Sequence, residues 1–362
     1  MRRRDFLSLT GVALALALGG CISAPKKKPV QEGAVVPDAS GAKIESVATN
    51  LEVPWDIDFS KDGRIFFTER VGRIRVIDGE LLPEPFATLP VTPRGEGGVL
   101  GLALHPSFPR KPFVYVYYTY SDNRGLLNRV SRFTAEGSRA VKEEIIIDGI
   151  PGGAIHNGGR LSFGPEGYLY ITTGDAGDSS TAQDLNSRGG KFLRLTDEGS
   201  VPEDNPFGSA VYSYGHRNPQ GLDWAPSGNL IATEHGPRAH DEINLIIKGR
   251  NYGWPEVKGI ASKEGFTDPL LESGLDTWAP SGAAFYRGSY FFAALRGRHL
   301  HKIVFNDDFT EVKNHEKLFE GTYGRLRHVA QNPGGELYLL TSNRDGRGNP
   351  APNDDRILKL VP

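Results

Sequence analysis

The fold is indicated most clearly by one stretch of the chain, Leu161-Ser162-Phe163-Gly164-Pro165-Glu166-Gly167-Tyr168-Leu169-Tyr170-Ile171-Thr172. A short apolar stretch (161–163) leads through a Pro/Gly turn to a second stretch that is rich in aromatic and aliphatic residues (168–172). Turn residues between two such stretches are typical of a β-hairpin. We therefore predict two antiparallel strands here.

The same hairpin pattern recurs along the chain. Close copies lie at residues 55–68, 222–233 and 329–341, and looser copies begin at Leu102 and Ala284. The copies follow one another at intervals of about 50–60 residues, which is the length of a propeller blade. Six such units account for nearly all of the chain beyond its first segment.

A ring of blades also solves a packing problem. One four-stranded sheet cannot bury both of its faces, whereas sheets packed in a ring cover one another and leave only short edges. No stretch longer than about ten residues has a convincing helical period. We therefore predict an all-β fold, a six-bladed β-propeller of four-stranded antiparallel blades, in which the last strand (356–360) pairs with the first (near 44–47).

Composition and charge agree with a turn-rich globular protein. The 362 residues include 45 glycines and 25 prolines, and 24% of the residues are charged. All-β folds of this size occur as single domains, so we assign residues 41–362 to one propeller domain. The net charge of -2 gives the chain no electrostatic attraction for nucleic acid, which we exclude as a partner.

The N-terminus has the composition of an export signal. Three arginines at positions 2–4 precede an apolar run (12–18) that is too short to span a membrane. Arg3-Arg4-Asp5-Phe6-Leu7 resembles a twin-arginine signal. Leu18-Gly19-Gly20-Cys21 resembles a lipobox, in which the cysteine becomes lipidated. Cys21 is the only cysteine of the chain, so a disulfide within the chain is excluded.

We therefore expect residues 1–21 to be an export signal with a lipobox and residues 22–40 to be a flexible tether, because the latter are rich in lysine and proline. The protein would then lie in the cell envelope, on the periplasmic or outer-surface side. Its contact with the membrane would be limited to the lipid on Cys21.

Three glycine-rich motifs contain the best candidates for catalysis. They are His156-Asn157-Gly158-Gly159-Arg160, Gly174-Asp175-Ala176-Gly177 and Gly215-His216-Arg217-Asn218-Pro219-Gln220-Gly221. Glycines beside polar side chains indicate tight loops or a close approach of the backbone to a ligand. A His, an Asp and an Arg that meet in one cleft provide a proton acceptor, a group that orients it and a fixed positive charge. Such a set suits the removal of a proton and a hydride from an alcohol.

Together with Asp241-Glu242-Ile243-Asn244, these motifs resemble the soluble quinoprotein aldose sugar dehydrogenases, relatives of soluble glucose dehydrogenase that bind pyrroloquinoline quinone (PQQ) and calcium. The resemblance extends over about residues 45–360. It implies an oxidoreductase that oxidises the C1 hydroxyl of aldose sugars to lactones by hydride transfer to PQQ. The electron acceptor is unknown, and the chain would be a monomer or a homodimer.

The resemblance also implies roles for single residues. His156 is the general base that takes the proton of the C1 hydroxyl, and Asp175 orients and polarises it next to the substrate. Arg217 holds the quinone oxygen on which negative charge develops. Glu96 lies where some relatives have a glutamine that touches the sugar, so it is assigned to the substrate.

PQQ carries three carboxylates, and its site therefore needs cations. The resemblance assigns the following residues to the cofactor: Arg217, Asn218, Arg296, Arg325 and Arg327. Arg296 stands where the family typically has a lysine, which keeps the charge but changes the geometry. The main-chain carbonyls of Gly236 and Pro237 match calcium ligands, and carbonyl oxygens suit this hard cation.

Two other functions fit a propeller. A lactonase-type hydrolase would hold an axial calcium and use water as its nucleophile, and a non-enzymatic propeller would bind a partner at the cell surface. The fold alone does not separate these functions, because propellers host many of them. Several converging arginines favour the dehydrogenase, since a tricarboxylate quinone needs them and a lactonase does not. Each residue also has a structural alternative, such as an Asx turn for Asp175 or an internal ion pair for Arg217.

Overall fold

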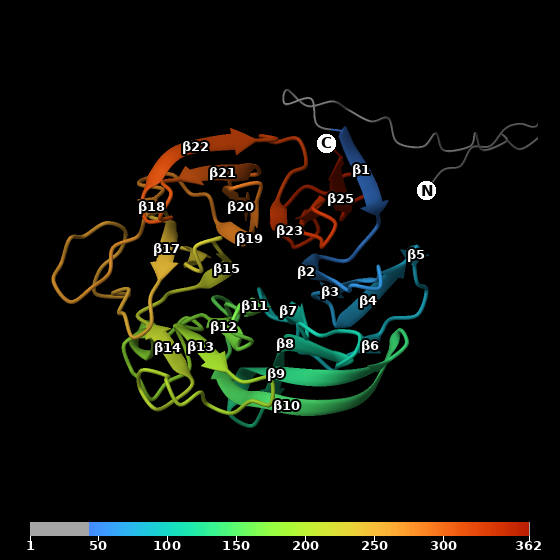
Figure 1. Cartoon of the computed structure of the whole chain (residues 1–362), viewed down its shortest axis with the longest axis horizontal. Coiled ribbons are helices and arrows are strands. Elements are labelled where there is room, and N and C mark those ends of the chain that lie inside the picture. Colours follow the sequence, from blue (N-terminus) through green and yellow to red (C-terminus); the bar gives the residue numbers. More distant parts are fainter. Residues whose placement is uncertain (1–42, 362) are drawn as a thin grey trace, which may run out of the picture. The chain divides into compact units, whose positions relative to one another are not determined.

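The computed structural model describes residues 43–361, which are almost entirely β-structure (Figure 1). These residues form six antiparallel sheets that are arranged as the blades of a ring. They contain no α-helix, and their one helical turn is the 3₁₀ helix η1 (Ser179–Ala182). The predicted six-bladed β-propeller is therefore confirmed.

The first three blades are built from strands that follow one another in the chain. Blade 1 contains β2 (Pro54–Phe59), β3 (Ile65–Glu69), β4 (Arg73–Asp78), β5 (Glu80–Leu81) and β6 (Ala87–Thr88). Blade 2 contains β7 (Val99–Leu104), β8 (Phe113–Asp122), β9 (Gly125–Glu136) and β10 (Arg139–Pro151). Blade 3 contains β11 (Leu161–Phe163), β12 (Leu169–Thr173), β13 (Lys191–Leu195) and β14 (Val211–Tyr214). Blade 1 departs from the four-stranded pattern, because β5 and β6 both pair with β4.

The remaining blades complete the ring. Blade 4 contains β15 (Pro219–Trp224), β16 (Leu230–Glu234), β17 (Glu242–Ile246) and β18 (Leu271–Glu272). Blade 5 contains β19 (Pro280–Tyr286), β20 (Ser289–Ala294), β21 (Leu300–Phe305) and β22 (Val312–Leu318). Blade 6 contains β23 (Leu326–Gln331), β24 (Leu337–Thr341), β25 (Ile357–Val361) and, at its outer edge, β1 (Lys43–Ala48).

The repeats in the sequence are the inner hairpins of the blades. In the hairpin of blade 3, the N–H of Gly167 donates to the carbonyl of Gly164, and the N–H of Gly164 donates to the carbonyl of Tyr168, both at 2.8 Å. Gly167 has a φ of +88°, and a Cβ at this position would meet no atom within 4 Å. The turn therefore requires glycine for its backbone conformation and not for space.

The hydrophobic core lies between the blades. Within the described residues, each interface between neighbouring blades has its own cluster of buried apolar side chains. Phe66 of blade 1 shares a cluster with Val114 of blade 2, and Ile57 of blade 1 shares another with Leu340 of blade 6. Each blade is thus stabilised by both of its neighbours, as a ring requires.

The ring is closed by the first described strand. β1 pairs antiparallel with β25, with Ile44 opposite Leu360 and Ser46 opposite Leu358. Blade 6 therefore takes three strands from the end of the chain and one from near its start (Figure 1). This pairing confirms the predicted contact between residues 356–360 and 44–47.

Residues 1–42 and 362 lie outside the described part of the chain. The predicted export signal, the lipidation of Cys21 and the tether at 22–40 all fall in this segment. Between residues 43 and 361, no helix has the length and hydropathy that a membrane span requires.

Candidate functional site

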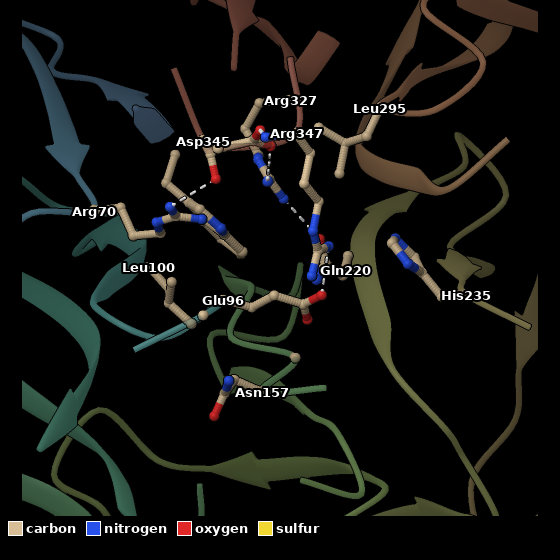
Figure 2. Close-up of a pocket in the computed structure, with 14 residues that line it drawn as sticks. Arg70, Glu96, Leu100, Asn157, Gln220, His235, Leu295, Arg327, Asp345 and Arg347 are labelled. Carbon is tan, nitrogen blue, oxygen red and sulfur yellow. Dashed lines mark hydrogen bonds and ion pairs between the residues drawn. The ribbon is translucent and has the colours of Figure 1, made fainter. Parts of the chain in front are cut away.

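A cavity of about 170 Å³ lies where loops and innermost strands of all six blades meet. Figure 2 shows its polar and charged lining, which comprises Arg70, Glu96, Asn157, Gln220, His235, Arg327, Asp345 and Arg347. Three guanidinium groups face two carboxylates, so the lining carries a net positive charge. Such a cavity suits an anionic ligand. We refer to it as the central cavity.

The predicted base and the predicted orienting acid are in direct contact. His156, in the loop before β11, has its Nδ1 2.7 Å from Oδ1 of Asp175, which follows β12. The main-chain N–H of His156 donates to Glu96 Oε2 (2.9 Å), which ties this loop to the central cavity. Because a carboxylate faces Nδ1, the neutral imidazole keeps its proton there and presents its lone pair at Nε2.

Asp175 is held by three donors. Besides His156, the N–H of Gly177 donates to Oδ1 (2.8 Å) and Trp254 Nε1 donates to Oδ2 (2.9 Å). Burial raises the pKa of Asp175, but these hydrogen bonds outweigh burial and hold the pKa below its usual value. The sequence alone indicates only a core position for Trp254. That interpretation is incomplete, because sequence context does not separate a hydrogen-bonding indole from one that only packs.

The third motif brings its own side chains to the same place. Arg217 Nη1 donates to the carbonyl of His235 (3.2 Å), and its guanidinium lies 5.4 Å from the centre of the Trp254 ring. Asn218 Oδ1 accepts a hydrogen bond from the N–H of Gly158 (3.0 Å). The three glycine-rich motifs, two of which belong to blade 3 and one of which leads into blade 4, are thus joined by direct contacts.

Several buried polar atoms in or beside the central cavity lack a protein partner within residues 43–361. They are Arg217 Nε, Asn218 Nδ2, His235 Nε2 and Arg327 Nε. A buried polar group without a partner costs about 1–3 kcal/mol, so a cluster of them indicates a site that is completed by a ligand. Burial lowers the pKa of His235 to about 4, which keeps its ring neutral at pH 7.

The two predicted arginines of blade 6 converge on Asp345. Arg325 Nε and Nη2 donate to Asp345 Oδ2 (2.9 and 2.7 Å), and Arg327 Nη2 lies 3.9 Å from the same oxygen. Arg327 Nη1 also donates to Gln220 Oε1 (3.0 Å). Burial lowers the pKa of Arg327 to about 9, because one shared carboxylate compensates its charge only in part. Asp345 was not predicted, although its motif, Asp345-Gly346-Arg347-Gly348, has the same glycine-rich character as the others.

The predicted substrate residue Glu96 is paired at the cavity wall. Its Oε1 accepts from Arg347 Nη1 (2.8 Å), and its Oε2 accepts from the main chain of His156. Burial raises the pKa of Glu96, but the hydrogen bond from His156 and the charge of Arg347 outweigh burial and lower it. Glu96 is therefore an ionised acceptor beside the candidate base. Its contact with a sugar stays a prediction.

Of the ten predicted site residues that the structure describes, Glu96 and Arg327 line the central cavity and the other eight do not. Five of these eight adjoin the lining through the contacts given above: His156, Asp175, Arg217, Asn218 and Arg325. The remaining three are Arg296, Gly236 and Pro237. Arg296 is exposed and lines a neighbouring groove. Gly236 and Pro237 follow His235 in a tightly curled loop, in which a Cβ on Gly236 would lie 2.1 Å from the carbonyl oxygen of Ala239. Within residues 43–361, no group of three or more His, Cys, Asp and Glu side chains could hold a metal ion. A calcium ion at this loop would therefore depend on carbonyl oxygens.

A Ser–His–Glu chain lies behind Arg217. Ser213 Oγ is 2.9 Å from His216 Nε2, and His216 Nδ1 is 2.8 Å from Glu234 Oε2, which is the connectivity of a hydrolytic triad. Ser213 and His216 are 0% exposed, so a substrate cannot reach the hydroxyl. Glu234 also accepts the main-chain N–H of Arg217. We infer that this series of hydrogen bonds, Ser213–His216–Glu234, positions Arg217 and that Ser213 is not a hydrolytic nucleophile.

Comparison with known proteins agrees with this geometry. The sequence profile of the glucose/sorbosone dehydrogenase family matches residues 51–357. A solved structure of a glucose dehydrogenase-like protein from Thermus thermophilus is 46% identical, with a TM-score of 0.85 over 89% of this chain and 100% of that one. The PQQ-bound aldose sugar dehydrogenase of Streptomyces coelicolor is 41% identical, with a TM-score of 0.82 over 89% of this chain and 99% of that one.

Aldose sugar dehydrogenase YliI of Escherichia coli K12 is 32% identical, and the alignment covers 84% of this chain and 91% of YliI. The family profile covers almost the whole propeller and includes all three glycine-rich motifs. The resemblance inferred from those motifs is thereby confirmed, and the chain belongs to the glucose/sorbosone dehydrogenase family of oxidoreductases.

Proposed function

We propose that the protein is a PQQ-dependent dehydrogenase that oxidises the C1 hydroxyl of aldose sugars to lactones. The observation that carries the proposal is the 2.7 Å contact between His156 Nδ1 and Asp175 Oδ1, beside a cavity with a net positive lining. The PQQ-bound relative from Streptomyces coelicolor supports the choice of cofactor.

The residues around the central cavity fit a planar tricarboxylate. The unpartnered nitrogens of Arg217, Asn218 and Arg327 can donate to cofactor oxygens, which would remove the cost of leaving them buried and unpaired. Carboxylates would also compensate the excess positive charge around Arg327. Arg325 adds a guanidinium that Asp345 holds in place. Arg296 would contribute only from the neighbouring groove.

In this proposal PQQ, when bound, supplies the electrophilic carbonyl carbon that accepts hydride from C1 of the sugar. His156 Nε2 takes the proton of the C1 hydroxyl, since Asp175 holds the other ring proton at Nδ1. The resulting imidazolium is stabilised by the ionised Asp175. Arg217 places a positive charge where negative charge develops, and Glu96 accepts hydrogen bonds from sugar hydroxyls.

We also propose that the carbonyl groups of Gly236 and Pro237 bind calcium next to the cofactor. Their loop starts at His235, which lines the cavity, and it is fixed by a hydrogen bond from the N–H of Gly236 to Asp241 Oδ1 (3.0 Å). Carbonyl oxygens on a rigid loop suit a hard cation. Loss of activity on treatment with a chelator, with recovery on addition of Ca²⁺, is the expected result.

The lactonase alternative is disfavoured by the charges on the innermost strands. The ring of Trp55 lies 4.1 Å from the guanidinium of Arg160 and 5.6 Å from that of Arg327. The carboxylates near these groups are engaged by them: Asp56 lies 2.5 Å from Arg160, and Asp345 lies 3.9 Å from Arg327. Two guanidinium groups repel a divalent cation at this level of the ring.

The proposal is tested by reconstitution. Purified protein that has been loaded with PQQ and Ca²⁺ is mixed with glucose and a redox dye, and sugar-dependent reduction of the dye is expected. Methyl glucoside, in which C1 carries no free hydroxyl, is the matched control and should be inert. Absence of sugar-dependent reduction contradicts the proposal, and hydrolysis of a lactone by the same preparation would favour the lactonase instead.

We further propose, from the sequence alone, that the protein is exported and anchored through a lipid on Cys21. The arginine-containing start and the lipobox support this location. A Cys21→Ser variant should move from the membrane fraction to the soluble fraction of the cell envelope. An unchanged distribution would exclude the lipid anchor.

A further inference from the structure

A second groove, of about 470 Å³, adjoins the central cavity between blades 5 and 6. Its volume lies within the range of about 300–1,000 Å³ that is usual for small-molecule sites. It is lined by three loops, which lie between β20 and β21, between β22 and β23, and between β24 and β25. We call it the arginine groove, because five of its lining residues are Arg296, Arg298, Arg325, Arg347 and Arg356.

The positive charge of the arginine groove is only partly compensated. Arg325 pairs with Asp345 (2.7 Å), Arg347 with Glu96 (2.8 Å) and Arg356 with Asp354 (2.8 Å). Arg296 and Arg298 are exposed, and neither makes an ion pair within the described residues. The groove therefore keeps a net positive charge on one wall, which attracts anions from solution.

The groove and the central cavity share part of their walls. Leu295 and Arg347 line both, and Arg325 lines the groove next to Arg327 of the cavity. The candidate base His156 belongs to a different part of the ring, the loop before β11 of blade 3. A molecule in the groove would thus lie next to the cofactor site without occupying the position of the sugar.

We propose that the arginine groove is the docking site of a small anionic electron acceptor. This inference rests on the proposed function, because a dehydrogenase must pass on the electrons that it takes from the sugar. Oxidation of the C1 hydroxyl releases two electrons and two protons. With a one-electron anionic acceptor such as hexacyanoferrate(III), two acceptor ions each take one electron, and the two protons pass to solvent.

The first test needs no turnover. Binding of hexacyanoferrate(II) to the cofactor-free protein is measured by calorimetry, for the wild type and for Arg298→Asp. Arg298 has a φ of +57°, a backbone conformation that Asp tolerates. Reversal of one unpaired charge in the groove should weaken binding at least about tenfold, and added salt should weaken wild-type binding.

Arg287→Asp is the matched control. Arg287 is also exposed, has a φ of +46° and belongs to blade 5, but it lies in the turn at the other end of β20. The Arg287→Asp variant should bind hexacyanoferrate(II) with the affinity of the wild type. Equal affinity of all three proteins overturns the proposal, as does displacement of hexacyanoferrate(II) by PQQ, which would make the groove part of the cofactor site.

The second test uses the PQQ-loaded enzyme. Arg298→Asp should raise the KM for hexacyanoferrate(III) at least about tenfold, but it should leave the KM for the sugar and for a cationic acceptor, hexaammineruthenium(III), without such an increase. A uniform change with both acceptors overturns the proposal. If the loaded wild type reduces neither acceptor in the presence of sugar, the proposed function fails, while the calorimetric test of the groove still stands.

Discussion

At the residue scale, the site is governed by the pairing of few carboxylates with many nitrogen donors. Asp175 accepts hydrogen bonds from His156, Gly177 and Trp254, and Asp345 forms ion pairs with both Arg325 and Arg327. Each acid therefore orients several groups, and donors that remain unpaired lie in or beside the central cavity. Two predictions follow from these pairings, one for chemistry and one for cofactor binding.

Replacement of the candidate base should separate catalysis from binding. His156 has a φ of +56°, so Asn is a better substitute than Ala, because Asn tolerates this conformation. His156→Asn should lower kcat at least about 10²-fold, since it removes the proton acceptor. Its affinity for PQQ, measured by fluorescence titration, should stay within a few-fold of the wild type. An undiminished kcat would remove His156 from the mechanism.

Replacement of Arg327 should have opposite effects on the two forms of the protein. Arg327→Met removes a buried charge that Asp345 compensates only in part, so the Tm of the cofactor-free protein should be unchanged or higher. The affinity for PQQ should fall about 10- to 100-fold, because a hydrogen bond to a charged group contributes about 1.5–3 kcal/mol. Calorimetry and thermal unfolding measure both effects. A lower Tm together with normal PQQ affinity would show that the role of Arg327 is structural.

At the element scale, carboxylates on innermost strands join neighbouring blades. Asp58 of β2 accepts the main-chain N–H of Leu104 of β7 (2.8 Å), and Asp223 of β15 accepts that of Phe285 of β19 (2.6 Å). Burial raises the pKa of both carboxyl groups to about 6. The folded protein thus binds these protons more tightly than the unfolded chain, in which the pKa of Asp is about 3.9. Their contribution to the free energy of unfolding increases as the pH falls from about 6 towards 4.

The raised pKa of Asp223 in the folded protein gives a prediction for how stability depends on pH. Asp223→Ser removes the titrating group together with its bond to the next blade. The loss of unfolding free energy relative to the wild type should therefore be larger at pH 5 than at pH 7.5. Urea unfolding at the two pH values measures the difference. An equal or smaller loss at pH 5 would show that the pKa of Asp223 is not raised in the folded protein.

How much the sequence predicts also depends on scale. The inner hairpins were predicted because their turn chemistry is local, as at Gly167, and three of the four glycine-rich site motifs were identified for the same reason. Apart from the two outer strands of blade 6, which were predicted at 356–360 and 44–47, the outer strands were not located, since strands as short as β18 have no periodicity. Asp345 and Trp254 were missed because their contacts, with Arg325 and Asp175, join residues that are 20 and 79 positions apart in the sequence and that only the folded blades bring together.

At the scale of the whole molecule, stability depends on the pairing of β1 with β25, which closes the ring at blade 6 and which we call the seam. A chain that starts at residue 50 lacks β1, whereas a chain that starts at residue 43 keeps it and serves as the control. The shorter chain loses several backbone hydrogen bonds, at about 1 kcal/mol each, and the buried side chain of Ile44. Its Tm should be lower by ~10 °C in a calorimetric scan. Equal Tm values would mean that the ring is stable without its closing strand.

The seam also has a consequence for how the protein is made. β1 is synthesised before any other described strand, and its partner β25 is synthesised after all of them. A nascent polypeptide therefore cannot finish blade 6 until β25 has been synthesised, and until then it exposes an unpaired strand edge. A polypeptide that stops before residue 357 would leave β1 without its partner, and such an open edge favours association with other chains.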